Sequence, residues 1–117
     1  EITDKFFAFV ATNVTHLAYD FKLAPSAHIS NGHLDLLMLR KKNKKPASFF
    51  QILKAFAEVE HGTHLEHYPD LFDELHTRAF YLEPLNVGSF VSVDGEVQKY
   101  EPTLVEVHPS LGNIFYL

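Results

Sequence analysis

The sequence of 117 residues contains no cysteine, and this absence excludes two kinds of small protein. Without cysteine there can be no disulfide framework and no zinc site built from thiolates. Long apolar runs are missing too, because no stretch approaches the roughly 20 apolar residues of a membrane-spanning helix. The lack of cysteine fits a reducing compartment, and we therefore expect a cytoplasmic protein.

Basic residues are in the minority. Ten Lys and Arg stand against fifteen Asp and Glu, which gives a net charge of −5. Nucleic-acid binding depends on clustered basic side chains that neutralise phosphates, so we expect no nucleic-acid partner. One basic run, residues 40–45 (RKKNKK), is typical of a solvated loop. Its alternative role is a transient, peripheral contact with anionic lipid head groups at a membrane.

Apolar and aromatic residues are plentiful. Hydrophobic residues make up 46% of the chain, and eleven residues are Phe, so the chain is too apolar to be disordered. The length suits one domain with a small core. Because the chain begins at Glu1 and not at Met, we expect residues 1–117 to be a piece of a longer protein.

Strand-forming segments dominate the chain. About six strands are expected, from the segments 6–15, 33–39, 75–82, 90–93 with 97–100, 103–107 and 113–117. The first is apolar enough to be a buried strand, and Asp94-Gly95 between two apolar runs predicts a hairpin within residues 90–100.

One segment has helical spacing. Apolar residues recur along residues 49–59 at the period of an amphipathic helix, with Ser48 as a possible N-cap and Gly62 as a stop signal. The fold class we expect is mainly β: an antiparallel β-sandwich or half-barrel with one amphipathic helix, which is α+β by strict count.

Three sequence segments resemble the diacylglycerol and sphingosine kinase superfamily. They are residues 24–36 (APSAHISNGHLDL), residues 62–64 (GTH) with 80–84 (FYLEP), and residues 93–96 (VDGE) with 107–109 (VHP). The first is similar to the family's "AP-x-A…DG-x-LD" pattern, the second to "G-x-H…LEP" of sphingosine kinases, and the third to "DGE". Each is weak alone, but their order and spacing across residues 6–109 are fairly specific.

The resemblance implies half of a kinase. Family members bind ATP between an amino-terminal α/β domain, which carries a "GGDGT" loop, and a β-sandwich domain that takes the lipid. No such glycine loop occurs in these 117 residues. We therefore expect residues 1–117 to form part of the carboxy-terminal domain, without the ATP-binding domain. Mg-ATP would serve the full-length protein, no cofactor is expected on this segment, and the segment alone should be inactive.

The Asp94-Gly95-Glu96 turn is the candidate catalytic element. Phosphoryl transfer needs carboxylates that hold Mg²⁺ or orient the attacking hydroxyl. The resemblance implies that Asp94 and Glu96 face the nucleotide and the transferred phosphate, with Gly95 close to the nucleotide. From the residues alone, Asp-Gly is also simply good turn chemistry.

The helix is the candidate lipid-binding element. By position in the resemblance, Ile52, Phe56 and His64 would line the slot for the lipid tail, which must be apolar and concave. The alternative is that the apolar stripe is ordinary core packing. Phe49 and Leu53 lie on the same stripe, and we expect both to belong to the core.

No metal site is expected, although two patterns were weighed. Asn31 stands where some bacterial relatives have an aspartate that helps hold a structural Mg²⁺, and without that charge a plain Asn31-Gly32 turn is favoured. His61, His64 and His67 recur every three residues, which could indicate zinc. Histidines near the end of a helix are the favoured interpretation.

The leading functional hypothesis is the lipid-binding domain of a kinase that phosphorylates a sphingoid base or a related lipid alcohol. The partners would be the lipid substrate and the amino-terminal kinase domain. The residues leave sphingosine, diacylglycerol and ceramide open, while "G-x-H" favours sphingoid bases. The alternatives are a non-catalytic lipid-binding or interaction module with the same fold, and a histidine-based metalloenzyme.

Overall fold

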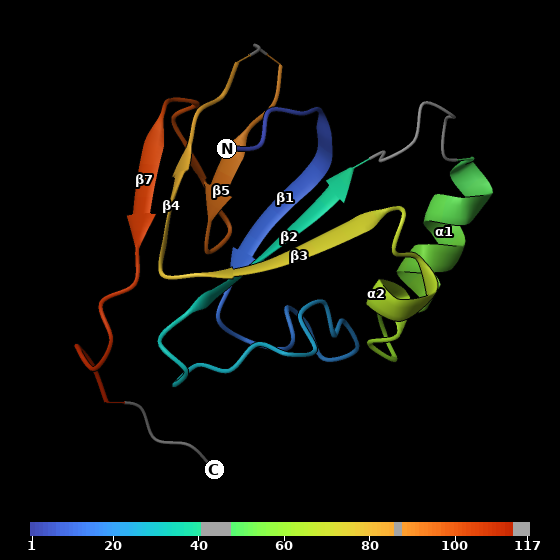
Figure 1. Cartoon of the computed structure of the whole chain (residues 1–117), viewed down its shortest axis with the longest axis horizontal. Coiled ribbons are helices and arrows are strands. Elements are labelled where there is room, and N and C mark those ends of the chain that lie inside the picture. Colours follow the sequence, from blue (N-terminus) through green and yellow to red (C-terminus); the bar gives the residue numbers. More distant parts are fainter. Residues whose placement is uncertain (41–47, 86–87, 114–117) are drawn as a thin grey trace.

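Strands dominate the computed structural model, which describes residues 1–40, 48–85 and 88–113 (Figure 1). The elements in chain order are β1 (Phe6–Thr12), β2 (Leu34–Arg40), α1 (Phe49–Ala57), α2 (His64–His67), β3 (Phe72–Thr77), β4 (Ala79–Leu82), β5 (Val91–Val93), β6 (Glu96–Gln98) and β7 (Thr103–Glu106). They form a three-stranded sheet in the order β1-β2-β3 and two strand pairs, β4-β7 and β5-β6. Every pairing is antiparallel, so the expected mainly β fold class is confirmed. The strand expected at residues 113–117 falls almost entirely outside the described residues.

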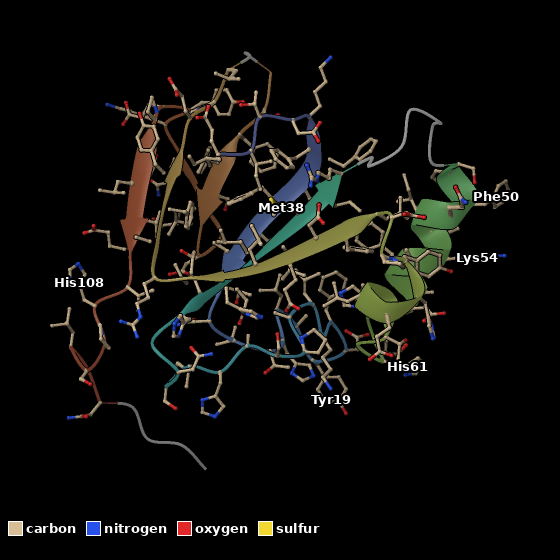
Figure 2. The ribbon with its side chains drawn as sticks, in the orientation of Figure 1. Tyr19, Met38, Phe50, Lys54, His61 and His108 are labelled. Carbon is tan, nitrogen blue, oxygen red and sulfur yellow. The ribbon has the colours of Figure 1, made fainter. Side chains whose placement is uncertain are left out.

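The centre of the three-stranded sheet is β2, and its residues 35–39 are all buried. Met38 lies in the middle of this sheet in Figure 2. The expectation that the first strand is buried was wrong, because β1 is an edge strand and Thr12 is its only buried residue. Phe7, on this strand, keeps 64% of its surface exposed.

The expected single strand at residues 75–82 is two strands in different sheets. β3 pairs with β2 and β4 pairs with β7, with the break at Arg78. The Thr77 hydroxyl bonds to both the backbone O and the backbone N of Ala79, which turns the chain there. The carbonyl of Arg78 then accepts a hydrogen bond from the Val107 amide at 2.8 Å, beside the new pairing. The hydrophobic pattern alone did not reveal this local turn.

The expected helix is α1, and Ser48 is confirmed as its N-cap. The Ser48 hydroxyl accepts a hydrogen bond from the Gln51 amide, and the Gln51 side chain accepts one from the Ser48 amide. α1 ends at Ala57, earlier than expected, because the next residues form tighter turns, such as Gly62 N–H to Val59 O. A second, one-turn helix, α2, follows and was not expected.

The segment between β1 and β2 covers the helical end of the sheet. Leu23, Ala24 and Ala27 from this segment pack with Leu37 of β2 and with Val59 after α1. A second cluster joins the sheet to the helices through Leu39, Ala55, Leu71 and Phe72. Among the described residues, no helix has the length and apolar character needed to cross a membrane.

Candidate functional site

The β5–β6 hairpin presents the Asp94-Gly95-Glu96 segment at a tight turn. Asp94 has φ 49° and Gly95 has φ 87°, and two consecutive positive values define the turn type that fits the twist of paired strands. Val93 and Glu96 close the turn as a cross-strand pair. Both carboxylates are exposed, and neither has a side-chain hydrogen bond or ion pair within the described residues. They are therefore free to act on a group outside this domain.

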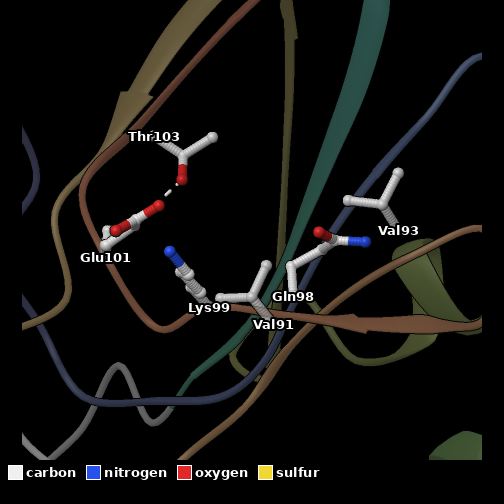
Figure 3. A pocket seen from close by; sticks show the side chains of 6 residues that line it. All are labelled: Val91, Val93, Gln98, Lys99, Glu101 and Thr103. Carbon is white, nitrogen blue, oxygen red and sulfur yellow. Dashed lines mark hydrogen bonds between the residues drawn. The ribbon is translucent and has the colours of Figure 1, made fainter.

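An open pocket of about 570 Å³ lies on the same hairpin (Figure 3). It is lined by Val91, Val93, Gln98, Lys99, Glu101 and Thr103. Figure 3 shows Lys99 near Glu101, so the polar wall carries one side chain of each charge. Asp94 and Glu96 are adjacent to this pocket along the chain but do not line it.

Phe56 and Ile52 lie on α1, at one end of the long axis of the molecule (Figure 1). Phe56 keeps 41% of its surface exposed, and its ring stacks on Phe21 with the centroids 6.4 Å apart. Ile52, four residues earlier, is half-buried on the helix face that Phe56 shares. Phe49 and Leu53, which we expected in the core, are exposed. The expectation for these two was wrong, because no described element covers that part of α1.

His64 is completely buried at the start of α2. Its Nε2 donates to the carbonyl of Leu23 at 3.0 Å, and its ring meets the ring of Phe72 edge-on at 4.9 Å. Burial lowers the pKa of the imidazole from its usual value, although the bond to Leu23 opposes this shift. The neutral ring therefore keeps an acceptor at Nδ1, which has no hydrogen-bond partner in the described part of the chain.

The structure joins two sequence segments that we had noted separately. Gly62 adopts φ +73°, and a Cβ there would come within 3.2 Å of Pro25 and 2.9 Å of Lys22. Two residues later, His64 bonds to Leu23 in the same covering segment. The glycine of "G-x-H" thus permits the close approach of the two segments, and the hydrogen bond from the histidine holds them together. Our sequence interpretation missed Phe21 and Leu23 as partners, and the neighbouring Ala-Pro was the only nearby signal.

The two candidate groups do not meet within this domain. Figure 1 shows α1 and α2 at one end of the long axis, with β5 towards the other. Ile52, Phe56 and His64 thus belong to one region, and Asp94 and Glu96 to another. A reaction that uses both needs a substrate or another domain that spans them.

The Asn31-Gly32 turn is a self-contained structure. The Asn31 side-chain oxygen accepts the His33 amide at 2.9 Å, and Gly32 has φ 71°. This is Asx-turn geometry, in which the side chain replaces a backbone partner. Because that oxygen is already engaged, the geometry favours a turn over a metal ligand.

The three regularly spaced histidines point to different partners. His64 is buried against Leu23, while the Nδ1 of His67 pairs with the carboxylate of Glu58. This contact and the Thr63 hydroxyl lower the pKa of Glu58, the Thr63 bond having the larger effect. His61 is exposed between the two helices (Figure 2). The arrangement gives no support to a zinc site or a metalloenzyme built on these residues.

Comparisons with known proteins assign the domain. A family model for the YegS C-terminal NAD kinase β-sandwich-like domain matches residues 3–116. Sphingosine kinase B of Dictyostelium discoideum is 36% identical over 107 residues, which covers 90% of this chain and 13% of that protein. Sphingosine kinase 2 of Homo sapiens is 30% identical over 109 residues, which covers 93% of this chain and 16% of that protein.

The chain therefore belongs to the YegS C-terminal family, the carboxy-terminal domain type of the lipid kinase superfamily. The resemblance seen in the sequence is confirmed at this level. The chain spans less than a fifth of the length of either of these curated relatives.

Proposed function

We propose that this chain is the lipid-side domain of a kinase that transfers phosphate from Mg-ATP to the hydroxyl of a sphingoid base or a related lipid alcohol. The observation that supports this most is the exposed, rigid Asp94-Gly95-Glu96 turn with two uncommitted carboxylates. A catalytic carboxylate in phosphoryl transfer acts on metal or on the attacking hydroxyl. Two carboxylates on a fixed turn suit that role when a nucleotide-binding domain faces them.

The helical end of the domain would take the lipid. Phe56 offers an exposed aromatic surface on α1, and His64 offers a buried acceptor on α2. A long alkyl chain needs an apolar wall with few polar groups. Because His64 is enclosed in this structure, lipid contact there would require a shift of the covering segment near Leu23. Phe56 and Ile52 need no such shift.

The amino-terminal kinase domain is the partner we propose for this domain. Phe7 on β1, Phe49 on α1 and Phe90 before β5 each expose more than 60% of their surface. They lie on different elements, so each is a separate candidate contact for that domain. The basic run at residues 40–45 was the candidate for membrane contact, and its residues 41–45 lie outside the described residues. Arg40 pairs with Asp4 and Asp73, so its charge is used within the domain.

The test measures turnover by the full-length protein with sphingosine and Mg-ATP. Asp94→Asn and Glu96→Gln should each lower kcat at least tenfold, which is about 1.4 kcal/mol of barrier. Asn tolerates a positive φ as well as Asp does, so the first variant removes the charge and keeps the turn. Glu106→Gln, a change at an exposed carboxylate on β7, is the matched control. Unchanged kcat in both hairpin variants, with unchanged melting, would reduce the segment to a turn.

A non-catalytic lipid-binding module is the second candidate. The observation that favours it is the separation of the helical region from the hairpin, since lipid binding at α1 would not need the carboxylates. The full-length sequence distinguishes the two functions. A glycine-rich "GGDGT" segment upstream of this domain supports the kinase, and the absence of that segment supports the lipid-binding module.

A further inference from the structure

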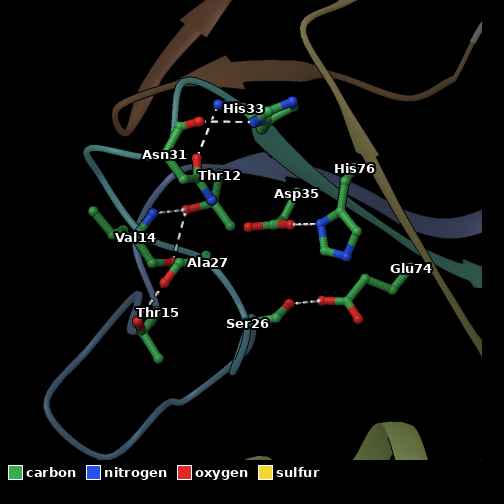
Figure 4. Close-up of polar contacts among 10 residues, drawn as sticks. All are labelled: Thr12, Val14, Thr15, Ser26, Ala27, Asn31, His33, Asp35, Glu74 and His76. Atoms are coloured by element: carbon green, nitrogen blue, oxygen red, sulfur yellow. Dashed lines mark hydrogen bonds and ion pairs between the residues drawn. The ribbon is translucent and has the colours of Figure 1, made fainter.

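Three potential ligand side chains, two carboxylates and one imidazole, converge away from the proposed kinase site. Asp35 on β2 and His76 on β3 are direct partners in the antiparallel register. Glu74 is two residues before His76 and shares its side of β3. One oxygen of each carboxylate and one ring nitrogen of His76 all lie within 4.8 Å of one another. Figure 4 shows the three side chains together, with Ser26 reaching Glu74.

Asp35 gives this group its unusual chemistry, because its side chain is completely buried. Oδ1 accepts a hydrogen bond from Nδ1 of His76, but Oδ2 has no hydrogen-bond partner among the described residues. A buried carboxylate is costly unless its charge and its lone pairs are compensated. The half-exposed His76 ring compensates one oxygen only. A cation bound beside the carboxylate would compensate the rest.

The other two side chains make the group accessible and ordered. His76 is exposed and Glu74 is half-buried, so an ion could enter from solvent. The Ser26 hydroxyl donates to Oε1 of Glu74 at 2.5 Å, which fixes that carboxylate from the segment that covers the sheet. A bound ion would thus connect β2, β3 and the covering segment.

We propose that Asp35, Glu74 and His76 bind one divalent cation of the zinc class. Zinc binds imidazole nitrogen and carboxylate oxygen at about 2.0–2.2 Å in tetrahedral geometry, so two of its ligand atoms lie roughly 3.4 Å apart. The candidate ligand atoms lie within 4.8 Å of one another, and Nδ1 of His76 contacts Oδ1 of Asp35 directly, so side-chain rotation must separate that pair around the ion. Imidazole in the set favours zinc over Mg²⁺ or Ca²⁺, which prefer oxygen alone. The ion replaces the hydrogen bond between His76 and Asp35, and the Nδ1 proton of His76 leaves to solvent.

The experiment uses the full-length protein, stripped of metal by a chelator and then titrated with Zn²⁺ alone, without ATP. Calorimetry and elemental analysis after dialysis count the equivalents bound. His76→Ala and Glu74→Gln should each bind one equivalent fewer than the native protein. Both residues reach solvent, so these variants should stay folded, and the completely buried Asp35 is left unchanged. A Zn²⁺-dependent rise in Tm should likewise be lost, since a ligand that binds only the folded state stabilises it.

His67→Ala is the matched control, because His67 also pairs with a carboxylate, that of Glu58, at the surface. It should keep the native number of equivalents and the native rise in Tm. Equal stoichiometry and affinity in the native protein, His76→Ala and Glu74→Gln would overturn the proposal. This test does not depend on kinase activity, so it can fail while the proposed function stands.

Discussion

Replacing Phe56 with alanine tests whether α1 contacts the lipid tail. About three-fifths of the residue is buried, since 41% of its surface is exposed. Full truncation of a buried Phe costs about 3–5 kcal/mol, so we expect a loss of roughly 2–3 kcal/mol in unfolding free energy. Part of this loss is the stacking contact with Phe21. This cost arises whether or not a lipid is present.

The lipid contributes a separate effect. Each methylene that the tail buries is worth about 0.8 kcal/mol, so losing contact with two of them lowers affinity roughly tenfold. We expect Phe56→Ala to raise KM about tenfold for a long-chain substrate. A short-chain analogue that does not reach α1 should keep its KM. The assay is KM against chain length, at a temperature where a melting curve shows the variant folded.

Phe50→Ala is the control for this series. Phe50 also lies on α1 and is 72% exposed, and Figure 2 shows it at the outer end of the helix. It should change neither stability nor chain-length preference by much. An equal change in KM for both chain lengths in Phe56→Ala, alongside the loss of stability, would refute lipid contact and leave Phe56 as core.

Three further predictions concern folding and metal binding. Because burial lowers the pKa of His64, the unfolded chain binds its proton more readily, and stability should fall as pH drops below about 6.5. The unfolding free energy should change by at most about 1.4 kcal/mol per pH unit, and melting curves at several pH values should show a smaller change in His64→Gln. The same pH dependence of stability in that variant and in the native protein would contradict this role of His64. Gly62→Ala should cost at least about 1–2 kcal/mol in chemical denaturation, because of its positive φ and the nearby Pro25, whereas Gly112→Ala, at an open position, should cost little; equal losses would contradict this. Added Mg²⁺ should not raise Tm through the Asn31 turn, and a rise that disappears in Asn31→Ala would count against it.

Local chemistry in the sequence predicted the parts of the fold that depend on near neighbours. Asp94-Gly95 implied a tight hairpin because few residues accept a positive φ, and both residues adopt one. Ser48 implied a helix start because its hydroxyl can accept a backbone amide within one turn, as it does from Gln51. Each signal needs only three or four residues to be complete.

Features that depend on distant neighbours could not be predicted in the same way. The apolar pattern of β1 suits a buried strand, but its edge position is set by the order of strands in the sheet. The pairing of Asp35 with His76 depends on the β2–β3 register, which joins residues 41 positions apart. His64 could be noted as part of a motif, but its bond to Leu23 required the path of the covering segment.

We propose that this domain supplies the lipid side of a lipid kinase and depends on an ATP-binding domain for activity. The most direct measurement is transfer of radiolabelled γ-phosphate to sphingosine by the full-length protein, beside residues 1–117 alone, both with Mg-ATP. We expect labelled sphingosine phosphate from the full-length protein and none from residues 1–117, because positioning ATP needs both sides of the cleft. Turnover by residues 1–117 alone would contradict the account. So would a full-length protein that labels neither sphingosine, diacylglycerol nor ceramide.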